Sequence, residues 1–229
     1  MKKLIYFRGC VAREKLNNIS EATEEILKAA SIDYKILRNE KCCGSFLLRT
    51  GFVRDAKEVM KNTLKEIEGK KIITSCAGCY KTFKKDYPEI LGVELDVMHT
   101  SQFFNELIKE GKIKVDFLDE TVTYHDPCHL GRYLEEYDAP REILNKMANL
   151  VEMDRSKEKS RCCGAGAGVK SAYPKITENI AKMRINDAEN VEAKIIVTSC
   201  PFCILNLKSA SKDDKKILDL SEIIKLNKL

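Results

Sequence analysis

Ten cysteines are the residues of this 229-residue chain most suited to chemistry, and they occur in one order twice. Each half of the chain carries a single cysteine, then an adjacent cysteine pair followed by glycine, then a Cys-x-x-Cys step. The motifs of the first half are YFRGC (6–10), KCCGS (41–45) and IITSCAGC (72–79). The motifs of the second half are YHDPC (124–128), RCCGAG (161–166) and IVTSCPFC (196–203). No cysteine lies outside this scheme, so the sequence indicates an internal duplication.

Five thiols in each half are one more than a simple metal site needs. Four thiolates satisfy a structural zinc ion, and four also satisfy a cubane iron–sulfur cluster. Adjacent cysteines bind one metal atom awkwardly, but they can reach two irons of one cluster if the chain turns, and Gly44 and Gly164 can supply that turn. The spacing therefore favours a multi-iron cluster with an extra ligand. Structural zinc in one half, a strained disulfide within each pair, and buried reduced cysteines are the alternatives.

The composition is that of an ordinary globular protein, with 44% hydrophobic and 33% charged residues. The net charge of +5 is spread along the chain without a block of like charges, so we expect no nucleic-acid partner. The apolar run Leu4–Phe7 is too short for a signal-peptide core, and no run approaches the roughly 18–20 apolar residues of a membrane span. We therefore expect a cytoplasmic protein, in which metal binding or redox chemistry explains ten cysteines better than structural disulfides do.

Short apolar runs alternate with helical periodicities along the chain. In the first half we predict strands over 3–7, 34–38, 71–75 and 94–98, and helices over 20–30, 51–68, 77–86 and 101–110. In the second half we predict strands over 121–125, 194–199 and near 150–153 and 216–219, and helices near 140–148 and over 174–191, 201–210 and 221–227. This alternation implies parallel βαβ units. The predicted fold is α/β, with two tandem pseudo-symmetric βαβ-type domains, 1–118 and 119–229, each a small parallel sheet with helices.

Every cysteine motif follows a predicted strand directly or within a few residues. In open α/β sheets ligands bind beyond the carboxyl ends of the strands, so the five cysteines of each half should converge on one edge of one sheet. We therefore expect one cluster at the carboxyl ends of the strands in each domain. Cys76 and Cys200 should lie near helix N-termini, where the partial positive charge favours thiolate and an anionic cluster.

Motifs for other redox cofactors do not occur in the sequence. There is no tandem CxxCxxCxxxCP run of the bacterial ferredoxin type and no GxGxxG flavin or nicotinamide fingerprint. The glycine-rich stretch GAGAG (164–168) follows a cysteine pair rather than a strand, which indicates close packing around a cluster. We therefore expect electrons to come from a partner subunit that carries ferredoxin-like iron–sulfur clusters, a flavin or both.

The cysteine motifs, together with TYHDPCHLGR (123–132) and CCGSFLLRTG (42–51), resemble those of the cysteine-rich CCG domain family. They are similar to the catalytic B subunit of heterodisulfide reductase and to the equivalent C-terminal part of its D subunit. The resemblance covers nearly the whole chain. Related CCG modules occur in the iron–sulfur subunits of glycolate oxidase and anaerobic glycerol-3-phosphate dehydrogenase, and in lactate-utilisation and thiol:fumarate reductase proteins.

The resemblance implies an iron–sulfur oxidoreductase subunit with two noncubane 4Fe–4S clusters, each held by five cysteines. It assigns one cluster to Cys10, Cys42, Cys43, Cys76 and Cys79, and the other to Cys128, Cys162, Cys163, Cys200 and Cys203. The implied reaction is reduction of a small-molecule disulfide, which in the family is the heterodisulfide of coenzyme M and coenzyme B from methanogenesis. There the disulfide lies between the two clusters, and one iron of each captures one sulfur as electrons arrive. Because both cysteine sets are complete, we favour the disulfide-reducing branch of the family.

Two histidines and two arginines close to the cysteines are further candidates. His125 and His129 flank Cys128 and are candidate catalytic residues that would donate a proton to a leaving thiolate. The alternative, which we favour for each, is hydrogen bonding or turn structure around the cluster. Arg49 and Arg132 are candidate substrate residues, because arginine binds sulfonate, phosphate or carboxylate bidentately. The alternative for both is charge balance for an anionic cluster or simple surface placement.

Two other functions remain open at the level of the sequence. One is a non-catalytic iron–sulfur electron-transfer subunit of a flavin-dependent 2-hydroxyacid dehydrogenase, acting on glycolate, lactate or glycerol 3-phosphate. The other is a protein in which zinc stabilises at least one half. Iron and acid-labile sulfide in the anaerobically purified chain separate these possibilities.

Overall fold

The computed structural model describes residues 4–211 and 215–226, and its core consists of two four-stranded parallel sheets. The first sheet has the order β2-β1-β3-β4, formed by β1 (Leu4–Phe7), β2 (Tyr34–Ile36), β3 (Lys71–Thr74) and β4 (Asp96–His99). The second has the equivalent order β6-β5-β7-β8, formed by β5 (Leu118–His125), β6 (Ala148–Leu150), β7 (Ile195–Thr198) and β8 (Lys216–Asp219). The order is the same in both halves, so the sequence duplication is also a duplication of the fold.

The central strands β1, β3 and β7 are largely apolar runs, as expected for strands buried on two faces. All residues of β1 (LIYF) and of β7 (IIVT) are buried. Neighbouring strands pair in regular register, with Ile5 beside Ile72 and Val122 beside Ile195, except that the register between β5 and β6 shifts between Leu118 and Thr121. Regular parallel pairing brings the carboxyl ends of all four strands of a sheet to the same edge.

The helices of the first half lie between and after its strands. They are α1 (Cys10–Lys15), α2 (Asn17–Ala29), α3 (Ser45–Arg49), α4 (Val53–Ile67), α5 (Ala77–Lys81), α6 (Tyr87–Leu91) and α7 (Thr100–Lys109). A π-helical turn, η1 (Thr82–Asp86), joins α5 to α6 without a break. The long α4 places Ala56, Met60, Thr63 and Ile67 on its buried side, at the three- and four-residue spacing of an amphipathic helix.

The second half repeats this arrangement. Its helices are α8 (Gly131–Leu134), α9 (Asp138–Met147), α10 (Val169–Ala172), α11 (Pro174–Glu189), α12 (Pro201–Ala210) and α13 (Leu220–Ile223), with a short 3₁₀ turn, η2, over Lys157–Lys159. Pro174 and Pro201 begin α11 and α12, as expected for proline in the first turn of a helix.

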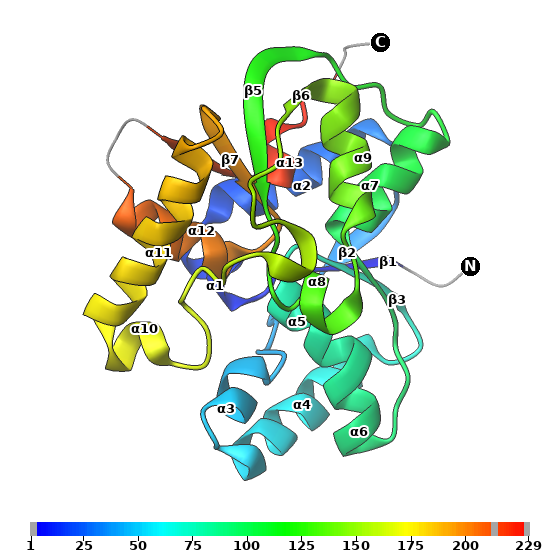
Figure 1. Cartoon of the computed structure of the whole chain (residues 1–229). Coiled ribbons are helices and arrows are strands. Elements are labelled where there is room, and N and C mark those ends of the chain that lie inside the picture. Colours follow the sequence, from blue (N-terminus) through cyan, green and yellow to red (C-terminus); the bar gives the residue numbers. More distant parts are fainter. Residues whose placement is uncertain (1–3, 212–214, 227–229) are drawn as a thin grey trace.

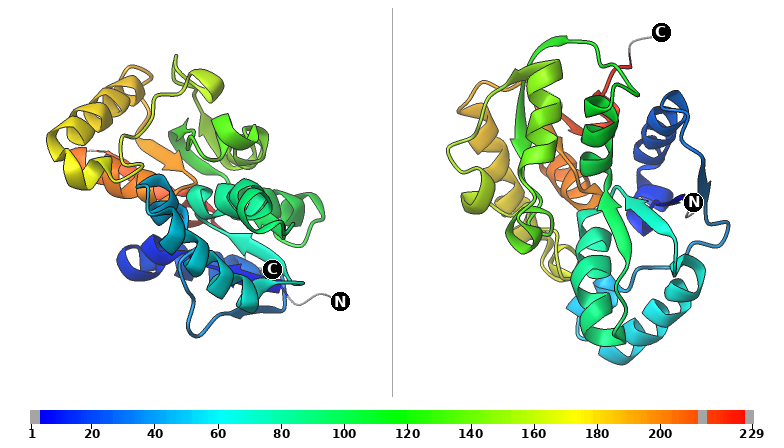
Figure 2. Two further views of the ribbon diagram at one scale, coloured as in Figure 1. Left: turned by 90° about the horizontal axis from the view of Figure 1, so that it is seen from below. Right: turned by 90° about the vertical axis from the view of Figure 1, so that its right-hand side faces the viewer.

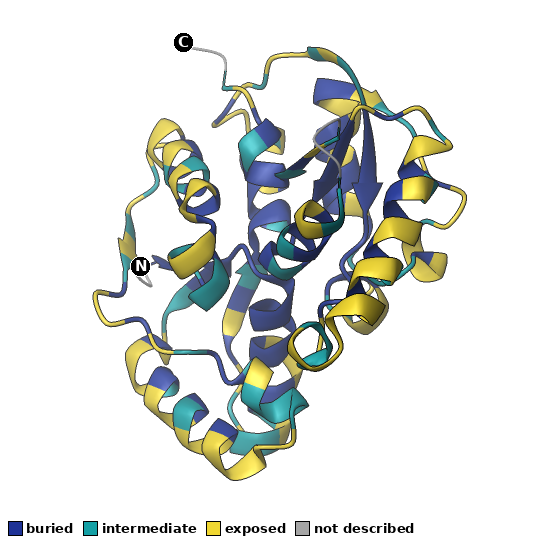
Figure 3. Cartoon of the chain, turned by 90° about the vertical axis from the view of Figure 1, so that its left-hand side faces the viewer, coloured by how far each residue is buried: buried dark blue, intermediate teal, exposed yellow. Residues whose placement is uncertain are grey.

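Each sheet packs one face outward against its own helices and the other face inward against the opposite half. In the first sheet, Ile5 and Phe7 share a core cluster with residues of α4, α5 and α6, whereas Leu4 and Tyr6 belong to a second cluster. That second cluster joins α2 and α7 of the first half to α9 and Tyr124 of the second half. Figure 2 shows the helices of the two halves on opposite sides of the molecule, and Figure 3 shows buried strands at its centre. The halves therefore share one continuous interior.

The packing between the halves has approximate two-fold symmetry. Helix α7 of the first half packs against α9 of the second, and α13 of the second half packs against α2 of the first. Because α7 corresponds to α13 and α2 to α9 in the repeat, these two contacts are equivalent. The same surface is used twice, as in a symmetric dimer.

Most predicted elements are confirmed, with shifts at some boundaries. The strand predicted near 150–153 lies at 148–150, and the helix predicted over 77–86 continues through η1 and α6 to Leu91. The helix predicted over 221–227 is only α13, and its last predicted residue lies outside the described residues, as does Lys3 of the first predicted strand. The short helices α1, α3, α8 and α10 were not predicted.

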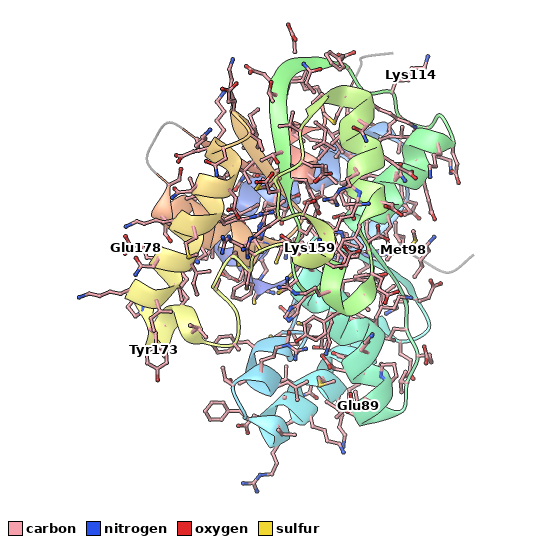
Figure 4. The ribbon with its side chains drawn as sticks, in the orientation of Figure 1. Glu89, Met98, Lys114, Lys159, Tyr173 and Glu178 are labelled. Atoms are coloured by element: carbon pink, nitrogen blue, oxygen red, sulfur yellow. The ribbon has the colours of Figure 1, made fainter. Side chains whose placement is uncertain are left out.

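Several charged side chains lie on the outside of the molecule. The labelled Glu89, Lys114 and Glu178 lie at separate places on the outside of the ribbon in Figure 4. In the described part of the chain, no helix is both long enough and apolar enough to cross a membrane.

Candidate functional site

One cavity between the two halves is lined by all ten cysteines. Each cysteine is a free thiol. The inner members are buried, and four are partly accessible from the cavity: Cys10, Cys42, Cys128 and Cys162. The two sets of five thiols, 118 or more residues apart in the chain at each equivalent position, therefore face the same space.

Each set is assembled from the carboxyl ends of strands, as predicted. Cys10 begins α1 three residues after β1, and Cys76 is the N-cap residue of α5 directly beyond β3. In the second half, Cys128 follows β5 and Cys200 is the N-cap residue of α12. The helices α1, α5, α8 and α12 accordingly lie near the middle of the molecule in Figure 1. Helix N-termini direct their partial positive charge at the thiols.

The adjacent cysteine pairs are shaped by the glycine that follows each of them. Gly44 and Gly164 have φ of +91° and +93°, which is the left-handed region predicted for them. The turn lets the Gly44 N–H point back to Cys42 Sγ at 3.4 Å, and the Gly164 N–H to Cys162 Sγ at 3.3 Å. The first thiol of each pair therefore faces the cavity with a backbone donor, while the second is buried.

The same cysteine of each half favours the thiolate form. A hydrogen bond from Cys10, another from Cys43 and the Gly44 N–H lower the pKa of Cys42 to about 2. Hydrogen bonds from Cys128 and Cys163, with the Gly164 N–H, lower the pKa of Cys162 in the same way. Each half thus concentrates negative charge on sulfur at an equivalent point, which suits a cationic metal centre.

The two sulfur sets meet at the pseudo-two-fold axis. Cys200 accepts hydrogen bonds from Cys203 and Cys76, and these lower its pKa well below the usual thiol value. The same contact with Cys200 raises the pKa of Cys76. The contact between Cys76 and Cys200 links the two five-cysteine sets directly.

The donor set suits an iron–sulfur cluster in each half. All ten donors are sulfur, the ligand type that iron–sulfur clusters prefer, and a tetrahedral zinc ion would leave one thiol of each set unused. A ring nitrogen of His125 also lies within 4.8 Å of the sulfurs of Cys163 and Cys203. The first-set residues that would hold a cluster are Cys10, Cys42, Cys43, Cys76 and Cys79, and the second-set residues are Cys128, Cys162, Cys163, Cys200 and Cys203.

One end of the cavity is polar. A Cβ atom placed on Gly78 would lie 3.5 Å from His129 Nδ1 and 3.8 Å from Ser45 Oγ, so the absence of a side chain at Gly78 leaves room for these groups. His129 packs edge-on against Tyr133, with 5.2 Å between ring centroids, and the Arg49 guanidinium lies over the same Tyr133 ring. Ser45, Arg49 and His129 all line the cavity.

The Arg49 guanidinium is held by a buried charge cluster. Its Nη2 donates to Asp86 at 3.0 Å, and Asp86 also accepts from Lys81 at 2.5 Å. Lys81 and Asp86 are almost fully buried, whereas the side chain of Arg49 is 21% exposed. The cluster carries two positive charges against one negative, so the polar end has an excess positive charge suited to an anion.

The other end of the cavity is apolar. In the repeat, Val11 occupies the position of His129, Phe202 that of Gly78, and Val169 that of Arg49. Val11 and Phe202 line the cavity there, and α1 packs against α12. The duplication has therefore kept the sulfur sets alike and made the cavity walls different.

The four polar residues predicted to act on the substrate separate into two groups. His129 and Arg49 line the cavity, whereas His125 and Arg132 are not among its lining residues. His125 lies behind the second sulfur set, and Arg132 donates to the Ser160 carbonyl beside the second cysteine pair. The structure therefore brings two of the four candidates to the cavity.

Both candidate histidines are neutral near pH 7. Burial lowers the pKa of His125 to about 3, and the Arg184 guanidinium acts in the same direction. Burial also lowers the pKa of His129 from its usual value. These rings therefore offer N–H groups rather than an imidazolium proton.

Sequence reasoning missed Arg184, Tyr133 and the Lys81–Asp86 pair. Arg184 lies in the middle of α11 and its partner His125 is 59 residues away, so no local motif connects them. Lys81 and Asp86 are five residues apart, which is not a helical neighbour spacing, and only the π-helical turn brings them together. The only sequence signal for this pair was two opposite charges five residues apart, directly after the Cys-x-x-Cys motif.

Comparison with known proteins finds relatives that are reductase subunits and iron–sulfur proteins. The D subunit of a dihydromethanophenazine:CoB–CoM heterodisulfide reductase from Methanosarcina acetivorans is 41% identical, over 97% of this chain and 58% of the relative. The B subunit of a CoM/CoB fumarate reductase from Methanothermobacter marburgensis is 35% identical, over 96% of this chain and 45% of the relative. An uncharacterized iron–sulfur protein of Methanocaldococcus jannaschii is 35% identical, over 98% of this chain and 46% of the relative. The chain thus spans about half the length of these relatives.

The model of one protein family matches the chain in two places. This family, described as the cysteine-rich domain CCG, matches residues 4–84 and 122–208. Each matched segment contains one complete set of five cysteines, and together the segments cover more than half of the chain. The chain therefore belongs to the cysteine-rich CCG domain family.

Proposed function

We propose that the chain is an iron–sulfur redox subunit with two CCG domains, 1–118 and 119–229, each of which binds one noncubane 4Fe–4S cluster through five cysteines. The observation that carries this proposal is the single cavity lined by all ten cysteines. Two clusters bound there would face each other across the pseudo-two-fold axis. The names of the relatives, which include two reductase subunits and an iron–sulfur protein, support the same interpretation.

We propose that the reaction is the reductive cleavage of a small-molecule disulfide in the cavity. The two clusters would supply the two electrons that convert one disulfide into two thiolates, and these would take up two protons from solvent to leave as thiols. The protein contributes a dry, sulfur-lined space in which the substrate S–S bond is held between the halves. His129 Nδ1 or Nε2 would donate an N–H hydrogen bond to a departing thiolate, and this lowers the free energy of the charged product.

The unlike ends of the cavity favour an unsymmetrical disulfide. The Arg49 guanidinium, in its positive cluster with Lys81 and Asp86, would bind an anionic head group close to one sulfur. Val11 and Phe202 would contact an apolar chain on the other sulfur. This polarity agrees with a heterodisulfide that has one anionic and one apolar half, and the name of the Methanosarcina relative gives a CoB–CoM heterodisulfide as the substrate of that protein.

We propose that the electrons come from a partner subunit that contains ferredoxin-like iron–sulfur clusters or a flavin, in the cytoplasm. Two of the relatives are named as subunits of reductases, which supports work within a complex. The alternative is a non-catalytic electron-transfer subunit, for example of a flavin-dependent 2-hydroxyacid dehydrogenase. The polar anchor Arg49 beside the cavity favours a bound substrate over pure conduction.

Metal analysis of the anaerobically purified protein tests the cluster assignment. Two 4Fe–4S clusters predict about eight iron and eight acid-labile sulfide per chain, with little zinc. Stoichiometric zinc without iron would overturn the proposal. With iron confirmed, the EPR spectrum should change when an unsymmetrical disulfide is added, whereas a conduit would be reduced without responding to it.

Steady-state kinetics test the substrate assignment. We expect Arg49→Gln to raise KM for an anionic unsymmetrical disulfide by about tenfold or more, because a charge-assisted hydrogen bond contributes about 1.5–3 kcal/mol. The exposed Arg54→Gln is the matched control and should leave KM unchanged. Equal activity of both variants with the anionic disulfide would remove Arg49 from the substrate site.

A further inference from the structure

The motif that contains the first cysteine of each half differs between the halves at its second residue. The first-half motif YFRGC (6–10) aligns with YHDPC (124–128), so Phe7 corresponds to His125. Both side chains are fully buried at the carboxyl end of the central strand, behind the sulfur set of their own half. The repeat therefore places an apolar ring beside one sulfur set and an imidazole beside the other.

Arg184 fixes the imidazole of His125 in one form. The Arg184 Nε–H donates to His125 Nδ1 at 3.0 Å. Since arginine is always a donor here, Nδ1 must be the unprotonated nitrogen and the ring proton lies on Nε2. A nitrogen that carries a proton cannot bind a metal, so His125 can act toward the cluster only as an N–H donor.

His125 Nε2 has no hydrogen-bond partner in the described part of the chain. A ring nitrogen of His125 lies within 4.8 Å of the sulfurs of Cys163 and Cys203, and Nδ1 is already occupied by Arg184. A buried, unpaired N–H group has a substantial free-energy cost unless an acceptor is present. Thiolate or sulfide sulfur of a cluster held by these cysteines is the acceptor that this site would provide.

Arg184 is itself held rigidly and brings positive charge to this side. Its side chain is fully buried, and its Nη1 donates to the Arg155 carbonyl at 2.7 Å and to Asp187 at 3.3 Å. Asp187 also pairs with Arg161 at 2.9 Å. Two guanidinium groups therefore share the Asp187 carboxylate, and the Arg184 cation lies directly against the His125 ring.

At the position that corresponds to His125, the first half has the aromatic ring of Phe7. Phe7 packs edge-on against Phe83, and Phe83 packs in the same way against Tyr87, both with 5.0 Å between ring centroids. The Tyr87 hydroxyl is buried, and the negative charge of Cys43 is among the causes that raise its pKa, after burial. Tyr87 is therefore a neutral O–H group near the first sulfur set. The described contacts of Tyr87 include no cation that corresponds to Arg184.

We propose that His125, positioned by Arg184, donates an N–H hydrogen bond to sulfur at Cys163 or Cys203 and makes the second-half cluster easier to reduce than the first-half cluster. This inference rests on the proposed cluster binding. Hydrogen bonds to cluster sulfurs and nearby positive charge both stabilise the reduced, more negative state. One electron then passes from the first-half cluster, which is oxidised, to the second-half cluster, which is reduced. The second half is the electron acceptor of the pair, and the donor subunit docks nearer the first.

Redox titration followed by EPR tests this assignment in the iron-loaded protein. We expect two midpoint potentials in the wild type. His125→Phe gives the second half the residue that the first half has at this position. We expect it to lower only the higher midpoint potential. The expected change is tenfold in the ratio of reduced to oxidised cluster, or about 59 mV for one electron. Arg184→Gln should shift the same potential in the same direction. His125→Asn, whose amide can accept from Arg184 and donate onward, should recover part of the shift.

Controls separate this inference from the proposed function. Tyr87→Phe should leave the higher midpoint potential unchanged. Any shift in this variant should be in the lower midpoint potential. Iron and sulfide contents are measured first for every variant: a wild type without iron would overturn the proposed function. Full iron content with unshifted potentials in His125→Phe and Arg184→Gln would overturn this inference alone. If His125→Phe does not fold, Arg184→Gln and His125→Asn still decide the outcome.

Discussion

At the scale of single residues, the duplication conserved the ligands and changed what surrounds them. The two halves keep five cysteines and one turn-forming glycine each, yet Phe7 corresponds to His125, Val11 to His129 and Gly78 to Phe202. Ligand geometry tolerates no change, whereas the cavity wall can vary independently in each half. A pair of equal sites has in this way become a pair with different chemistry around each.

The exchange at Gly78 and Phe202 gives a direct test at this scale. We expect Gly78→Ala to be tolerated, because its Cβ would meet His129 and Cys76 at ordinary contact distances of 3.5 and 3.6 Å. Gly78→Phe should retain iron but reduce disulfide turnover at least tenfold, because the ring would occupy the space in front of His129 and Ser45. Iron analysis and turnover are compared for both variants. Unchanged turnover in Gly78→Phe would show that the polar end is not used.

At the scale of elements, the turns and short helices do the positioning. The π-helical turn η1 places Lys81 and Asp86 side by side and directs Asp86 to Arg49. The left-handed glycines turn each cysteine pair. None of these features is a long periodic element, although together they set the positions of both the sulfurs and the polar anchor.

We expect Asp86→Ala to destabilise the protein by about 3–5 kcal/mol, because it leaves the buried Lys81 ammonium without its carboxylate. The control is Glu178→Ala, which removes an exposed helical pair with Lys182 and should leave the urea midpoint unchanged. Urea unfolding of the anaerobic, iron-loaded proteins measures the difference. A cost below about 1 kcal/mol for Asp86→Ala would show that Lys81 is solvated or neutral.

The turn glycines predict a second contrast at this scale. Gly44→Ala adds a Cβ that would lie 2.6 Å from Met60 Cγ at a backbone φ of +91°, whereas Gly69→Ala has a similar φ of +72° and open space. Both substitutions should lower the free energy of unfolding by about 1–2 kcal/mol, because a residue with a Cβ atom is strained in the left-handed backbone conformation. Only Gly44→Ala should also lose iron, because its clash displaces Cys42 and Cys43. Similar iron contents in both variants would contradict a positioning role for the Gly44 turn.

The sequence was sufficient for the repeat, the parallel strands and the convergence of the cysteines. The apolar runs of β1, β3 and β7 predict strands because these strands are buried on both faces and each is followed by a cysteine motif at which the chain turns. The short helices α1, α3, α8 and α10 were missed because stretches of four to six residues carry too little periodicity. The His125–Arg184 contact was missed because it joins β5 to α11, and its formation depends on tertiary packing rather than local pattern.

At the scale of the whole molecule, the two halves meet through a buried polar layer behind the sulfurs. Tyr6 hydrogen-bonds Ser75 at 2.7 Å within the first half. At the ends of the edge strands, His99 caps α7 and Asp219 caps α13 through equivalent capping boxes. These two N-cap residues occupy corresponding positions in the repeat, and both are buried. The interface between the halves therefore contains a histidine and a carboxyl group that water does not reach.

Asp219 makes the stability of the joined halves depend on pH. Burial raises the pKa of Asp219 from 3.8 to about 7, although Ser221 donates to its carboxylate. The folded state therefore holds this proton while the unfolded state has lost it, so the contribution of Asp219 to stability is complete below pH 3.8 and declines up to about pH 7. Asp219→Asn keeps an N-cap side chain but cannot ionise.

We therefore expect Asp219→Asn to gain stability relative to the wild type as pH rises from about 5 to about 8. At about 1.4 kcal/mol per pH unit the gain is roughly 2–3 kcal/mol. Urea midpoints of both anaerobic proteins at pH 5, 6, 7 and 8 measure it, and the exposed Asp33→Asn is the matched control that should follow the wild type. Parallel pH profiles for the wild type and Asp219→Asn would mean that the carboxyl group ionises normally and that the interface between the halves admits water.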